Sequence, residues 1–190
     1  MRIAIRSFTL ALRHITLLVM LFALPQTLAA QNARPNDCTA VIQHPWPGDF
    51  IAEASSEGDC GVAEVTLKVF NWGDELKVWH ASYFSNDLFG FENLATEQEM
   101  LYALHGWISF YASFSNTGSL PQWVEGADGP IASEFPFMVS DEFDRYDYMR
   151  ATAMNGNMAC YIQGFESLLC LVKDHNGPGL KPIGYQLFPG

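Results

Sequence analysis

The chain has 190 residues, of which 49% are hydrophobic, 14% aromatic and 16% charged, and its formal net charge is −11. This composition excludes an intrinsically disordered chain, and the length suffices for one domain with its own hydrophobic core. With 21 acidic against 10 basic residues, nucleic acid is an unlikely partner class, because phosphate backbones are bound by clustered lysine and arginine.

Residues 1–30 have the order of a secretory signal peptide. Arg2, Arg6 and Arg13 precede an apolar run, Ile15 to Leu24, and small residues follow it. This run is half of the ~20 residues that a membrane-spanning helix needs, so we expect cleavage rather than an anchor. No later segment reaches that length, so we expect a soluble periplasmic or secreted protein with no membrane span after cleavage.

Cleavage would make the mature chain more acidic. Three of the 10 basic residues leave with the signal peptide and no acidic residue does, so seven basic and 21 acidic residues give −14. A field of that sign favours basic partners or cations, although solubility alone is the simpler interpretation of the charge.

Four cysteines lie in the part that is exported. An even number of thiols outside the cytoplasm predicts two disulfides, and four cysteines allow three pairings. We favour Cys38 with Cys60 and Cys160 with Cys170, because each pair is local in sequence and the second flanks a hairpin. The alternative is a catalytic thiol or a metal site. Since the chain has no Cys-x-x-Cys motif and no zinc spacing, we expect no metal and no cofactor.

The first half of the exported part is predicted to form a loop region followed by a hairpin. Residues 31–61 are polar and irregular, so we expect a loop pinned by a disulfide, with one short strand around Val41. Residues 62–70 and 75–83 alternate apolar and polar side chains, which is the period of half-buried strands. A turn in which Asn71 pairs with Asp74 would place His80 on the apolar face of this hairpin.

The longest helix is predicted to begin near Thr96. Thr96 and Glu99 have the spacing of a capping box, and apolar residues then recur near the helical period as far as Phe114. Residues 121–130 are predicted to be loop, and residues 135–139 a short strand.

A second, shorter helix is predicted from Asp141 to about Met154, with Ser140 as its N-cap. Two apolar runs, 158–163 and 168–172, predict a hairpin, and a last strand is expected near 183–187. Together these elements predict an α+β fold, in which an antiparallel sheet of about five strands packs against one long and one shorter helix. Residues 31–190 would form this single disulfide-containing domain.

Candidate catalytic residues are few. The chain lacks the sequence motifs of the common hydrolase classes, although a triad assembled from distant residues needs no motif. His80, on an apolar strand face, and His105, at the edge of the long helix's apolar face, are the candidates. A histidine in such a place is more often a structural residue than a catalytic one.

Aromatic residues in predicted loops are the candidate binding residues. Trp46, Phe89, Phe91 and Trp123 all lie in segments interpreted as loops. Exposed aromatic side chains in loops are typical of surfaces that bind a protein or a saccharide. The alternative is that the loops fold back and their aromatic rings cover the core.

These observations support a small exported binding or inhibitory module that uses its loop aromatics on a protein or saccharide partner with a basic or apolar surface. An envelope hydrolase with a site that includes His80 or His105 is the alternative. A passive structural component of the envelope is a third possibility.

The disulfides can be tested by alkylation. We expect the intact mass of the exported protein to stay unchanged when it is unfolded and treated with an alkylating reagent without reductant, because no thiol is free. A mass that corresponds to four alkylated thiols would contradict both disulfides.

Overall fold

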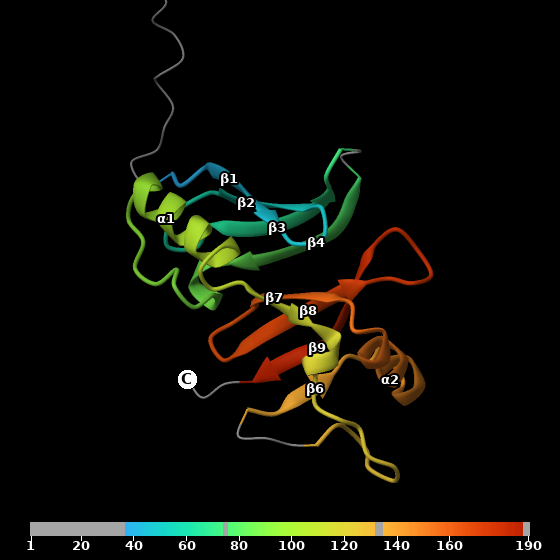
Figure 1. The fold of residues 1–190 in the computed structure, drawn as a ribbon. Coiled ribbons are helices and arrows are strands. Elements are labelled where there is room, and N and C mark those ends of the chain that lie inside the picture. The colour runs from blue at the N-terminus through green and yellow to red at the C-terminus, as the bar shows by residue number, and fades with distance from the viewer. Residues whose placement is uncertain (1–36, 74–75, 132–134, 188–190) are drawn as a thin grey trace, which may run out of the picture. The chain divides into compact units, whose positions relative to one another are not determined.

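The computed structural model describes residues 37–73, 76–131 and 135–187, so the predicted signal peptide lies outside the described residues. The described part is α+β and contains two antiparallel sheets, of four and five strands, and two α-helices (Figure 1). The class was therefore predicted correctly, but the strands form two sheets where one was expected.

The first sheet has the order β1-β2-β3-β4. Its strands are β1 (Ala40–Trp46), β2 (Phe50–Glu57), β3 (Glu64–Asn71) and β4 (Lys77–Phe84). Residues 31–61 were predicted to form a loop region with one short strand around Val41; that strand is present as β1, but β2 was missed. Pro45 is tolerated because β1 is an edge strand, where one side needs no N–H donor. On β2 the buried side chains are Ala52, Ala54 and Ser56, which are too small to give an apolar pattern.

The register between β3 and β4 also differs from the prediction. Leu67 pairs with Ala81 rather than Val78, and Lys68 pairs with His80. The reason is a longer turn and an irregularity after Val69, which together shift the pairing by three residues. Because side chains alternate along a strand, an odd shift exchanges the faces. His80 therefore lies exposed, on the face opposite the buried row of β3.

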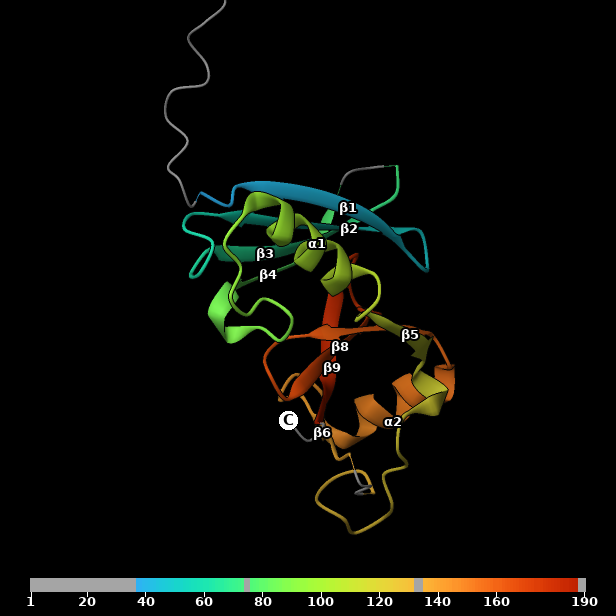
Figure 2. The ribbon, with the colours of Figure 1, turned by 90° about the vertical axis from the view of Figure 1, so that its left-hand side faces the viewer.

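Helix α1 (Glu97–Ile108) covers the first sheet (Figure 2). The predicted capping box is confirmed, since the Thr96 side chain accepts from the Glu99 N–H and the Glu99 side chain accepts from the Thr96 N–H. Its buried face packs on β1 and β2, where the small side chains of β2 let the helix approach closely. The helix ends at Ile108, so Tyr111 and Phe114 lie beyond it although they continue its apolar period.

The second sheet has the order β5-β7-β8-β9-β6. Its strands are β5 (Ser113–Asn116), β6 (Phe137–Val139), β7 (Asn157–Ile162), β8 (Ser167–Lys173) and β9 (Leu180–Leu187). The predicted hairpin is β7–β8. Its strands are continuously apolar because both faces of the sheet are covered: Tyr161 and Leu171 belong to the core of the first sheet, and Met158 and Val172 belong to a second core.

That second core packs beneath helix α2 (Arg145–Met154), which contributes Tyr148 and Ala151. The helix begins later than predicted. Asp144 rather than Ser140 is the N-cap, and its side chain accepts from the Asp147 N–H at 2.8 Å. Ser140 instead caps a short turn, in which its carbonyl accepts from the Phe143 N–H.

Both predicted disulfide pairings are confirmed. Cys38–Cys60 ties the chain before β1 to the turn between β2 and β3. Cys160–Cys170 joins residues that pair directly across β7 and β8. Closing loops of this size restricts the unfolded chain and is worth on the order of 3 kcal/mol each in the loop-entropy description.

A cluster of aromatic rings joins the two sheets. Trp107 of α1 meets Tyr83 of β4 and Tyr161 of β7 edge-on, with ring centroids 6.0 and 5.9 Å apart. The Trp107 indole N–H donates to the Ile162 carbonyl at 2.7 Å. The hydroxyls of Tyr161 and Tyr83 lie 2.9 Å apart, and the Trp79 indole N–H donates to the Tyr161 hydroxyl at 3.2 Å. Every polar atom of the junction named here thus has a partner.

Within the described ranges, neither helix has the length and apolar character that crossing a membrane requires.

The tyrosine junction predicts a loss of stability at alkaline pH. Burial raises the pKa of Tyr161 well above its usual value of 10.0, and burial also raises the pKa of Tyr83. Above about pH 10 the unfolded tyrosines ionise while the folded ones stay neutral, so the free energy of unfolding falls by about 1.4 kcal/mol per pH unit for each such group. Tyr161→Phe should lessen the total fall in the free energy of unfolding between about pH 9 and 11 by about 1.4 kcal/mol, measured by urea unfolding.

Tyr102→Phe is the matched control, because Tyr102 lies on α1 and is 71% exposed. Its slope should equal that of the parent protein. Equal slopes in the parent and in Tyr161→Phe would contradict the assignment of the alkaline loss to the junction.

Candidate functional site

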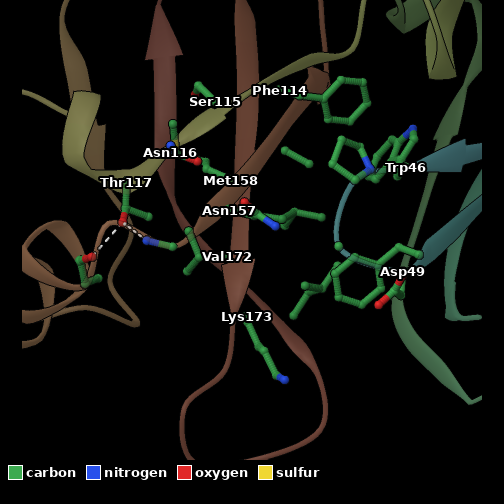
Figure 3. Close-up of a pocket in the computed structure, with 18 of the residues that line it drawn as sticks. Trp46, Asp49, Phe114, Ser115, Asn116, Thr117, Asn157, Met158, Val172 and Lys173 are labelled. Atoms are coloured by element: carbon green, nitrogen blue, oxygen red, sulfur yellow. Dashed lines mark hydrogen bonds between the residues drawn. The ribbon is translucent and has the colours of Figure 1, made fainter.

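A cavity of about 790 Å³ lies where turns of the first sheet meet strands of the second (Figure 3). The first sheet contributes the end of β1, the β1–β2 turn and the residues after β3. The second sheet contributes β5, β7, β8 and the start of β9. Its volume falls within the range of about 300–1,000 Å³ that is usual for small-molecule sites.

The β1–β2 turn forms one wall of the cavity. Gly48 and Asp49 both have positive φ, at +86° and +63°, which turns the chain within three residues between Trp46 and Phe50. The Asp49 carbonyl accepts from the Trp72 N–H at 2.7 Å, so the two turns of the first sheet are fixed to each other. A Cβ at Gly48 would lie 3.2 Å from the Asn157 side-chain nitrogen. Glycine therefore lets this wall approach β7.

Thr117, in the 3-10 turn η2 (Thr117–Ser119), holds the opposite end of the cavity in place. Its buried hydroxyl donates to the Ala151 carbonyl of α2 at 2.6 Å and accepts from the Gly156 N–H at 3.0 Å (Figure 3). One side chain thus links the segment after β5 to the end of α2 and to the turn before β7. These three segments all contribute lining residues.

Aromatic side chains make much of the apolar lining. Trp46, Phe50, Trp72 and Phe114 all line the cavity. The rings of Trp46 and Phe114 meet edge-on at 5.6 Å, which brings β1 and β5 together. Trp46 is buried and its indole N–H donates to the Ile108 carbonyl at 2.8 Å. Trp72 is 65% exposed, so its ring is available to a ligand.

Polar side chains stand beside these rings. Asn116 and Asn157 supply amides, Asp49 a carboxylate and Lys173 an ammonium group. Figure 3 shows Asn157 pointing across the cavity from β7, with Asp49 and Lys173 coming from different walls. The cavity therefore combines flat apolar surfaces with hydrogen-bond donors and acceptors. Such a combination can bind a small ligand that is both apolar and rich in polar groups.

The four aromatic residues singled out in the sequence are not brought together. Trp46 lines the cavity as a buried residue, and Phe91 is buried in the core against Trp107. Phe89 is 43% exposed and lines a separate apolar hollow of about 540 Å³ with Tyr111 and Leu168. Trp123 is half-buried, packs edge-on against Tyr148 and lines a third hollow.

Neither candidate catalytic histidine lines the cavity. His80 is exposed on the outer face of β4. His105 is half-buried on α1, with its ring 6.0 Å from that of His44 and 5.3 Å from that of Phe110. In the described part of the chain, no side-chain hydrogen bond joins His80 or His105 to a carboxylate or a hydroxyl group.

Sequence reasoning missed most of the cavity. Trp72 lies in the segment predicted to be a turn. An aromatic residue in a turn was the signal that could have marked it as a candidate binding residue. Phe114 was assigned to the long helix. Asn157 and Lys173 lie at strand ends, where nothing in the sequence marks them, because their importance comes from strands that are distant in the chain.

Residues 37–73, 76–131 and 135–187 contain no group of three or more histidine, cysteine, aspartate or glutamate side chains that could hold a metal ion.

No protein-family model, curated protein or solved structure matches the chain.

The role of Thr117 can be tested by the nearly isosteric change Thr117→Val. We expect the free energy of unfolding to fall by about 1–3 kcal/mol, because the change leaves the buried Ala151 carbonyl and the Gly156 N–H without this hydroxyl partner. Urea unfolding followed by tryptophan fluorescence measures it. Thr152→Val is the control: its hydroxyl donates to Met149 within α2, and we expect a change within about 0.5 kcal/mol. Equal effects of the two changes would contradict this role.

Proposed function

We propose that the protein is an exported, non-catalytic binding module and that its ligand is a saccharide bound in the cavity between the two sheets. The observation that carries this proposal is the composition of the cavity lining. Aromatic rings, amides and a carboxylate surround a volume of about 790 Å³.

A saccharide matches this composition because its rings have two kinds of surface. The C–H groups of a pyranose face are apolar and pack against an aromatic ring, whereas the hydroxyls at its edge need donors and acceptors. In the cavity, Trp72 and Phe114 offer the first kind of contact. Asn116, Asn157 and Asp49 offer the second.

Export rests on the predicted signal peptide together with the two disulfides, which are typical of oxidising compartments. We propose a periplasmic or secreted location on these grounds. The competing function, an envelope hydrolase, requires a catalytic His80 or His105. Both lie outside the cavity lining, so the geometry gives this function no support.

The proposal is tested by measuring binding to oligosaccharides. A panel of neutral, N-acetylated and uronic-acid-containing oligosaccharides is screened, and each hit is titrated by calorimetry. Trp72→Ala and Phe114→Ala should each weaken binding of a hit by about tenfold or more, since each removes an apolar contact surface and about 1.4 kcal/mol corresponds to tenfold in affinity.

Phe110→Ala is the matched control. Phe110 is 79% exposed and lies outside the cavity lining, so binding should not change. The proposal fails if no oligosaccharide of the panel binds, or if hits bind both cavity variants as tightly as the parent protein.

A further inference from the structure

The ionisable groups of the cavity are few and come from different walls. Asp49 lies in the β1–β2 turn, Lys173 at the end of β8, and His175 in the loop that follows it. Figure 3 shows the Lys173 side chain extending below Asn157, with Asp49 on the other side of the cavity. The wall that carries Lys173 therefore differs in charge from the wall that carries Asp49.

Lys173 also differs from two neighbouring cations in having no carboxylate partner. Lys181 pairs with Asp174 at 3.6 Å, and Arg150 pairs with Asp147 at 3.8 Å. In the described part of the chain, Lys173 forms no ion pair and no side-chain hydrogen bond. Lys173 also lines a smaller hollow with Asp147 and Asp174, but these carboxylates pair with Arg150 and Lys181 instead.

We propose that the saccharide carries a carboxylate, as a uronic acid does, and that this carboxylate binds the ammonium group of Lys173. This inference rests on the proposed saccharide-binding function and specifies its ligand class. An ammonium group has three N–H donors and no acceptor, and a hydrogen bond between two charged groups is roughly twice as strong as one between neutral groups. A carboxylate is thus the acceptor that gains most from Lys173.

Asp49 sets the orientation of such a ligand. Its carboxylate can only accept hydrogen bonds, so it suits the hydroxyls of a neutral sugar unit and repels a second carboxylate. The ligand is therefore a short saccharide with one acidic unit at the Lys173 end and neutral units towards Asp49. A uniformly acidic polymer would meet like charge at one wall.

The acidic net charge does not oppose this assignment at contact distance. At physiological ionic strength, exposed charges are largely screened beyond a Debye length of about 8 Å. Carboxylates on distant surfaces therefore slow the approach of an anion more than they weaken its contact with Lys173.

The experiment compares two ligands that differ only in the carboxylate. The probes are disaccharides of a neutral hexose with a terminal glucuronic or galacturonic acid, each paired with its carboxyl-reduced counterpart, titrated by calorimetry at physiological ionic strength. The parent protein should prefer the acidic member of at least one pair by about fivefold or more. Lys173→Ala should bind the two members of that pair about equally, while its affinity for the reduced member should equal that of the parent protein.

Lys181→Ala is the matched control, because it removes the same charge from the neighbouring strand outside the cavity lining and should retain the preference. Equal binding of the acidic and reduced members by the parent protein, or a preference that persists in Lys173→Ala, would overturn this inference. Neither result would contradict the proposed saccharide-binding function. Absence of binding by every member of these pairs and of the wider oligosaccharide panel would overturn the proposed function and this inference with it.

Discussion

The contact between Trp107 and Tyr161 is the constraint on which the rest of the structure depends. The two sheets share no strand, so their arrangement is set by the side chains between them. Trp107 belongs to the helix that covers the first sheet and donates to the Ile162 carbonyl of the second. Tyr161 reaches back to the hydroxyl of Tyr83. Because each buried polar atom of this contact has a partner, the two sheets meet in one defined way, and the cavity walls hold their spacing.

Local chemistry explains which parts of this fold the sequence predicts. The capping box at Thr96, the alternation along β3 and the apolar runs of β7 and β8 are patterns that neighbouring residues produce, and each predicted its element. The strand expected around Val41 is β1, which continues through Pro45, whereas β2 was not predicted because its buried residues Ala52 and Ala54 are small. These two alanines lie under helix α1, and their small side chains let the helix pack closely on the sheet. Such a contact between distant segments leaves no pattern in the local sequence. The end of α1 escaped for a related reason, since Phe114 continues the helical period but packs on Trp46.

The site was less predictable than the fold. Trp46 was singled out for its place in a proline-flanked segment, and it does line the cavity, although as a buried residue joined to Ile108. His80 was a candidate because it was expected on the apolar face of the hairpin. It lies on the opposite face, because the register between β3 and β4 is shifted by an odd number of residues. Asn157 and Lys173 gain their position from pairing between strands, and spacing along the chain does not encode that pairing.

The cavity draws its lining from positions as far apart as Trp46 and Leu180, so both sheets must form before any of it exists. A ligand held there binds the native state alone and shifts the folding equilibrium of every strand at once. Contacts between residues this far apart in the sequence also form slowly during folding. If the chain is exported as proposed, occupancy of the site would therefore mark those chains in which both sheets have folded.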